Sequence, residues 1–112
     1  MKSTFVLAIT LLAFTGQAAA QKSWVTGRGD STCSEALASI EHESRTQVIF
    51  TEHLQGFINA LNWRGGKAVS HSVAGNTLAQ MWIAKCRLRS NADRRFVEIA
   101  DEIYLELEKL GK

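Results

Sequence analysis

Two cysteines, at positions 33 and 86, are the feature that most constrains how this 112-residue chain can fold. A disulfide between Cys33 and Cys86 would close a long loop, and the chain-entropy model credits such a crosslink with about 4 kcal/mol of stabilisation. That is comparable to the whole net stability of a small domain. A redox role would require a C-x-x-C pair, which the sequence lacks. Pairing is the default only if the chain folds in an oxidising compartment.

The first residues of the chain predict export to such a compartment. Lys2 supplies a positive start, an apolar segment follows at residues 5–14, and residues 18–20 are the Ala-Ala-Ala of a signal peptidase site. The alternative, a buried N-terminal helix, does not account for that site. The apolar segment is shorter than the roughly 20 residues that cross a bilayer. We expect residues 1–20 to be a cleaved signal peptide, and the mature chain to begin at Gln21 in the periplasm with its cysteines paired.

Nearly balanced charge gives no indication of a nucleic-acid or membrane partner. The chain has 13 Lys and Arg, 11 Asp and Glu, and a formal net charge of +2 at pH 7. So small an excess favours neither partner, and we expect none of either kind once the signal peptide is cleaved. In acid the carboxyl groups become neutral and the three histidines become charged. The resulting self-repulsion destabilises a compact state, so the composition permits an acid response.

The first half of the mature chain predicts an arm and two helices. Residues 21–31 contain two glycines and no periodicity, which predicts a flexible or loosely packed arm. Thr32 and Glu35 form a T-x-x-E capping box that opens the first helix. A second helix is predicted over residues 45–62, and Gly56 inside it marks either a close approach of another helix or nothing. Its apolar residues recur every three or four positions and form one face: Phe50, Leu54, Phe57, Ile58 and Leu61.

The second half predicts two more helices. The third is expected to begin at a cap formed by Asn76 or Thr77, and the last at a cap formed by Ser90 or Asn91. Gly111 ends the last helix. The apolar stripes are Leu78, Met81, Trp82 and Cys86 in the third helix and Phe96, Ile99, Ala100, Ile103, Leu107 and Leu110 in the last. In no segment do apolar and polar residues alternate with the two-residue period of a β-strand. The sequence thus predicts an all-α fold, a small four-helix domain over residues 32–112 closed by one disulfide.

The three tryptophans have different expected roles. Trp82 lies on an apolar stripe and is expected in the core. Trp24 is expected to hold the arm against the domain. Trp63 follows the second helix beside two glycines, where a large ring either caps the core or marks a possible surface contact.

No constellation in the sequence indicates an enzyme. The three histidines are scattered, there is no H-E-x-x-H motif or cysteine–histidine zinc spacing, and the serines lack a G-x-S-x-G context. The tripeptide at residues 28–30, Arg-Gly-Asp, matches a cell-adhesion motif that is common by chance. Carboxylates at positions 101, 102, 106 and 108 are interpreted as the solvated face of the last helix. We expect no catalytic residues, no metal and no cofactor.

Three segments resemble the HdeA-type family of periplasmic acid-stress proteins. Residues 32–37, Thr-Cys-Ser-Glu-Ala-Leu, are similar to that family's W-T-C-x-D-x-L opening. Residues 55–62 resemble its G-F-x-x-A-L-N segment, and residues 82–86, Trp-Ile-Ala-Lys-Cys, resemble its second-cysteine helix. The resemblance implies a four-helix fold with Cys33 paired to Cys86.

The same resemblance implies an ATP-independent holdase that is folded and dimeric at neutral pH. Acid would loosen it, and unfolded periplasmic proteins would then bind its exposed apolar surface. In this chain the implied client-binding residues are Phe50, Leu54, Phe57, Ile58 and Leu61. A second hypothesis is a Tai-type periplasmic immunity protein, which binds and inhibits a secreted toxin through a fixed patch around Trp63. A third is a protein-interaction module without chaperone activity.

Overall fold

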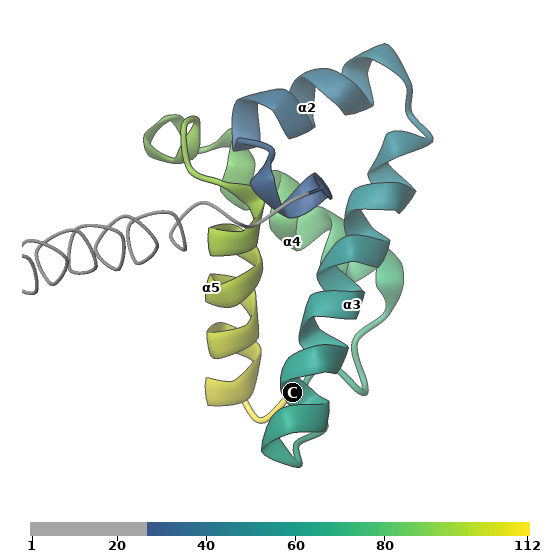
Figure 1. Ribbon diagram of the computed structural model, residues 1–112, viewed down its shortest axis with the longest axis vertical. Helices are drawn as coiled ribbons and strands as arrows, with labels where there is room; N and C mark the ends of the chain where they lie inside the picture. The colour runs from purple at the N-terminus through teal and green to yellow at the C-terminus, as the bar shows by residue number, and fades with distance from the viewer. Residues whose placement is uncertain (1–26) are drawn as a thin grey trace, which may run out of the picture.

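The computed structural model describes residues 27–112, and within them the chain is all helical (Figure 1). The predicted signal peptide, Trp24 and the first part of the predicted arm lie outside the described residues. The elements are η2 (Gly27–Asp30), α2 (Cys33–His42), α3 (Thr46–Gly65), α4 (Gly75–Arg87), η3 (Arg89–Asn91) and α5 (Phe96–Lys109). In this part of the chain the sole β-type pairing is an isolated bridge between Thr32 and Arg95. The predicted all-α, four-helix fold is confirmed.

The predicted capping box at the start of α2 is present. The Thr32 hydroxyl accepts a hydrogen bond from the Glu35 backbone N–H at 3.1 Å, and the Thr32 backbone N–H donates to Glu35 Oε1 at 3.1 Å. The hydrogen bond from the Thr32 backbone, and then the one with its side chain, hold the pKa of Glu35 below its ordinary value. These bonds satisfy amide groups that the helix itself leaves unpaired.

The end of α3 is set by a glycine in the left-handed region. Gly66 has φ = 63° and directly follows α3, the position at which helices commonly end with such a residue. Asn62, in the last turns of α3, then holds the following loop through its amide. Its Nδ2 donates to the Val69 carbonyl at 2.9 Å, and its Oδ1 accepts from the Val69 backbone N–H at 3.0 Å.

The caps predicted for the last two helices are wrong. α4 begins at Gly75, so Asn76 and Thr77 lie in its first turn, and no side chain caps it. α5 begins at Phe96, whose backbone N–H donates to the Ser31 carbonyl at 2.7 Å. Asn91, one of the two residues predicted to cap α5, instead donates a hydrogen bond from its side chain to the Lys85 carbonyl. The predicted residues are of types that often cap helices, but no side chain caps either helix.

α4 lies at the centre of the domain and packs against α2, α3 and α5. Figure 1 shows α2 crossing one end, with α3 and α5 lying lengthwise on the near side of α4. The Cys33–Cys86 disulfide joins the first turn of α2 to the last turn of α4, with a Cα–Cα distance of 4.9 Å. The pairing expected from the sequence is therefore present. Among the described helices, none has the length and apolar composition needed to cross a membrane.

Candidate functional site: the covered apolar face of α3

The apolar face predicted for the second helix lies against the rest of the domain. Phe50, Leu54 and Ile58 are fully buried, and Phe57 and Leu61 are partly buried against the same core. The 3.6-residue period explains this arrangement, because residues three and four apart share one face of a helix. The structure thus brings all five predicted residues together on one side of α3, and in this state they are largely inaccessible.

An aromatic cluster joins α3 to α4 and α5. Ring centroids lie 5.1 Å apart for Phe50 and Phe96, 5.5 Å for Phe50 and Trp82, and 5.2 Å for Trp82 and Phe96. The Trp82 indole N–H donates to the Thr51 hydroxyl at 3.0 Å, which satisfies its buried polar group. Trp82 is fully buried, as expected. The face of α3 therefore cannot be exposed without separating Phe50 from partners on two other helices.

The segment η2 covers one side of this cluster. The Arg28 guanidinium carbon lies 5.5 Å from the centroid of the Phe50 ring, a cation–π arrangement. Gly29 is buried, and Asp30 lies 3.5 Å from Arg95. The end of the predicted arm is thus packed on the domain. The Arg-Gly-Asp tripeptide makes contacts within the chain rather than presenting an adhesion loop.

Ion pairs hold the outer face of α5. Lys85 of α4 lies 2.6 Å from Glu106 and 3.9 Å from Glu102. Arg94, in the linker before α5, lies 3.1 Å from Glu102 and 3.4 Å from Glu98. Beyond these, Lys67 pairs with Glu108. The interpretation of these carboxylates as merely solvated is therefore incomplete, because α4, the linker and the loop after α3 each supply a cation to them.

A buried asparagine organises the linker between α4 and α5. Asn91 Nδ2 donates to the Lys85 carbonyl at 2.8 Å, at the end of α4, and Asn91 Oδ1 accepts from Arg94 at 3.0 Å. The linker is also bonded to the start of α2, since the Cys33 backbone N–H donates to the Arg94 carbonyl at 2.9 Å and that of Ser34 donates to Ala92 at 3.0 Å. These bonds hold the linker beside the disulfide.

His53 is the partly buried titratable group beside the aromatic cluster. Its ring centroid lies 5.9 Å from that of Phe96. Burial lowers the pKa of His53 below its ordinary value, because a charged imidazolium loses hydration there. Its neutral form is therefore the one that fits the folded domain.

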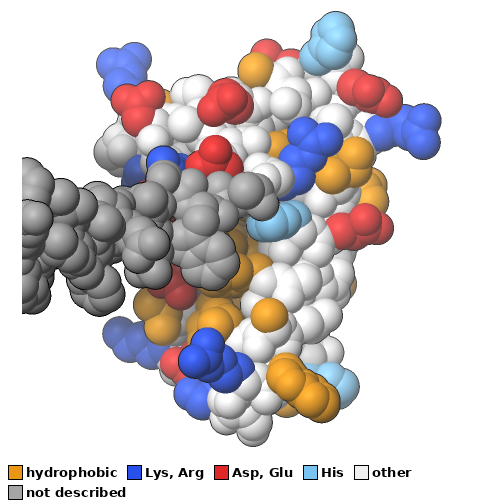
Figure 2. Space-filling model, viewed as in Figure 1, with side chains coloured by type: hydrophobic (Ala, Val, Ile, Leu, Met, Phe, Trp, Pro, Cys, Tyr) orange, Lys and Arg blue, Asp and Glu red, His pale blue; other side chains and the backbone are white. Residues whose placement is uncertain are grey.

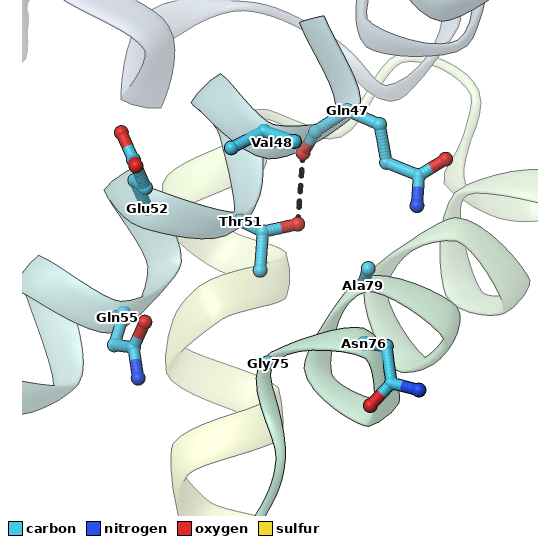
Figure 3. Close-up of a pocket in the computed structure, with 8 residues that line it drawn as sticks. All are labelled: Gln47, Val48, Thr51, Glu52, Gln55, Gly75, Asn76 and Ala79. Atoms are coloured by element: carbon cyan, nitrogen blue, oxygen red, sulfur yellow. Dashed lines mark hydrogen bonds between the residues drawn. The ribbon is translucent and has the colours of Figure 1, made fainter. Parts of the chain in front are cut away.

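The groove between α3 and α4 has no arrangement typical of catalysis. It encloses about 350 Å³ and is lined by Gln47, Val48, Thr51, Glu52, Gln55, Gly75, Asn76 and Ala79. Figure 3 shows carboxamide side chains at its rim, and the Thr51 hydroxyl turned back to the Gln47 carbonyl at 2.8 Å. Glu52 is the one titratable residue in this lining, so a nucleophile with an adjacent base is not assembled here.

Elsewhere in residues 27–112, the structure shows no cluster of three or more His, Cys, Asp or Glu that could hold a metal ion. Each buried side-chain nitrogen or oxygen in that range has a hydrogen-bond partner, so none awaits a ligand.

Trp63 does not cap the core. Its side chain is 91% exposed, whereas Ile58 is fully buried and Leu61 is partly buried. Of the two roles left open by the sequence, the position of Trp63 fits the surface contact.

Comparison with known proteins gives no relative: no family model, no curated protein and no solved structure matches this chain.

Proposed function

We propose that this protein is a periplasmic, ATP-independent holdase that is folded at neutral pH and binds unfolded proteins when acid loosens it. One observation carries the proposal. Of the six ion pairs in the described residues, five end on a carboxylate of α5, and the sixth ends on Asp30 of η2. α5 and η2, two of the elements packed on α3, thus carry the carboxylates of these ion pairs, which acid neutralises.

Acid weakens these ion pairs. At pH 2, well below the ordinary range of carboxyl titration, the carboxylates become neutral while Lys67, Lys85 and Arg94 keep their charge. Attraction is lost and repulsion among the cations remains. Protonation of His53 adds a charge beside the aromatic cluster. Each change favours separation of α5 from α3.

The disulfide and the linker hydrogen bonds do not depend on these carboxylates. Cys33–Cys86 keeps α2 and α4 joined in acid, and the linker remains bonded to the start of α2. Loosening of α5 and η2 would therefore uncover the apolar surface of the α3 face that Phe96 and Arg28 cover at Phe50, on a chain that still has a defined topology. Exposed apolar surface of this kind is what an unfolded client binds.

The test is aggregation of an acid-labile client protein near pH 2–3, followed by light scattering with and without the oxidised mature chain. We expect suppressed scattering, together with acid-induced binding of a dye that reports apolar surface. If the protein stays folded, binds no dye and leaves the scattering unchanged, the holdase proposal is wrong.

A second candidate is a Tai-type immunity protein, which the exposure of Trp63 favours. Such a protein binds a secreted toxin at neutral pH through a fixed surface and needs no acid transition. Protection of toxin-challenged cells that is lost in Trp63→Ala would support it. Oligomer mass measured against pH separates the candidates cheaply, since an acid-activated homodimer should change its mass and an immunity protein need not.

A further inference from the structure

The loop after α3 and the last residues of the chain meet at one end of the domain. The loop after α3 is bonded to the end of α5 and the residues beyond it, through Lys67 to Glu108 and through the Ser70 backbone N–H to the Lys112 carbonyl at 2.6 Å. Figure 1 shows the end of α3 and the chain terminus together at the lower end of the view. We call this region, residues 62–70 and 107–112, the α3–α5 end.

The α3–α5 end is basic. Arg64, Lys109 and Lys112 are exposed and have no ion-pair partner in the described part of the chain, and Lys67 adds a fourth cation that is paired with Glu108. Cations in the last turn of a helix offset its partial negative charge, which is one reason for Arg64 and Lys109. The total charge of the chain is nearly balanced and does not reveal this local excess of positive charge. Other carboxylates of α5, Glu102 and Glu106, are paired with Arg94 and Lys85 and do not offset it.

Two apolar side chains of the same segments are also exposed. Trp63 is 91% exposed and Leu110 is 67% exposed. Helix electrostatics does not explain an exposed indole ring, and the structure gives Trp63 no packing role. Figure 2 shows Lys and Arg side chains toward the lower left of the view and a projecting hydrophobic side chain toward the lower right.

The exposed side chains of this end indicate which kind of partner it would bind. A cavity of about 220 Å³ lies at this end, and Trp63 does not line it. A protein partner of ordinary affinity would cover about 800 Å² on each side, which calls for a broad complementary surface. A few projecting residues suit a bilayer surface better, because Trp prefers the headgroup level and Lys and Arg are attracted to anionic lipid.

We propose that the α3–α5 end binds the surface of an anionic lipid bilayer, with Trp63 at the headgroup level and the unpaired cations Arg64, Lys109 and Lys112 near lipid phosphates. This proposal differs from the expectation, drawn from total charge, that the mature protein has no membrane partner. The proposal does not depend on the holdase function, because the α3–α5 end is already exposed in the neutral-pH fold.

The test is co-sedimentation at pH 7 of the exported, signal-cleaved protein with lipid vesicles. One set is phosphatidylcholine and the other contains about 30% phosphatidylglycerol, an anionic lipid. We expect binding to the anionic set alone, weakened by salt. Each cation near the membrane surface raises the binding constant roughly fivefold. The double variant Lys109→Gln with Lys112→Gln should therefore weaken binding about 25-fold. Trp63→Ala should weaken it at least about fivefold.

Arg87→Gln with Arg89→Gln is the matched control. It removes the same charge from exposed residues at the other end of α5, beside the linker. We expect binding to change less than about twofold, with unchanged circular dichroism in all variants. Three results would overturn the proposal: no binding to anionic vesicles, equal binding to neutral vesicles, or equal loss in the control pair. Binding of a purified protein at Trp63 without any lipid affinity would assign this end to a protein partner instead.

Discussion

Gly56 lies inside α3 on its exposed side, and a Cβ added there meets no atom within 4 Å. It therefore does not mark a close helix approach. A glycine in a helix interior costs about 1 kcal/mol relative to alanine. We predict that Gly56→Ala raises the free energy of unfolding by about that amount in urea at pH 7.

The matched control is Gly66→Ala. Gly66 also has open space around it, but its φ of 63° disfavours any residue with a Cβ. The free energy of unfolding of this variant should fall by roughly 1 kcal/mol. Equal effects of the two substitutions would contradict the assignment of Gly66 as the residue that ends α3.

His53 contributes to pH dependence with a sign that its lowered pKa fixes. Because the unfolded chain binds the proton more readily, His53 stabilises the fold above the ordinary pKa of about 6.5, and this contribution is lost as the pH falls through the lower folded pKa. We predict that His53→Gln flattens the fall in unfolding free energy below pH 6.5. The exposed His71→Gln is the control, and an equal flattening there would refute the role of His53.

Periodicity predicted the buried residues of α3 because burial of a helix face follows from local spacing. It could not predict Asn91, whose partners Lys85 and Arg94 are placed by the turn between two helices. Nor could it distinguish the two roles proposed for Trp63. Exposure depends on where the neighbouring loop and α5 lie, and no local signal encodes that.

At the scale of elements, the paired carboxylates of α5 can be tested by neutral replacements. Glu102→Gln with Glu106→Gln removes the partners of Lys85 at every pH. Exposed ion pairs contribute a few tenths to 1 kcal/mol each, so we predict a loss of about 1 kcal/mol at pH 7. At pH 2 the wild type has lost the same attraction, and the difference should vanish.

In this variant the midpoint of acid unfolding, followed by circular dichroism, should therefore move to higher pH. Asp101→Asn is the control, since Asp101 is exposed on α5 and makes no ion pair in the described residues. If Asp101→Asn moves the midpoint as far as the double replacement, the ion pairs are not what holds α5.

The disulfide is the second element-scale test. Replacing Cys33 and Cys86 by serine removes the link between α2 and α4, and we predict a loss of about 2–5 kcal/mol in urea denaturation. The pairing could be predicted from the signal-peptide pattern, which predicts export, and from the presence of two cysteines. The ion pairs of α5 could not, because Lys85 and Glu106 are brought together only when α4 and α5 pack.

At the scale of the molecule, the proposed holdase function requires one part of the domain that acid leaves joined and one part that acid releases. The first is α2, α4 and the linker, tied by a disulfide and backbone hydrogen bonds. The second is α5 with η2. Packing and ion pairs hold α5 to α4 and to the loop after α3, and Asp30 of η2 pairs with Arg95, directly before α5. An acid-activated holdase needs this division, because it must expose apolar surface and still refold when the pH rises.

The emission of Trp82 across an acid titration tests this account most directly. Trp24→Phe with Trp63→Phe leaves Trp82 as the single tryptophan, buried between Phe50 and Phe96. We predict that its emission shifts to longer wavelength in acid, with the disulfide intact, at the pH where client aggregation is first suppressed. A Trp82 emission that stays unchanged to pH 2 while clients are still captured would contradict the release of α5 and the role of the α3 face.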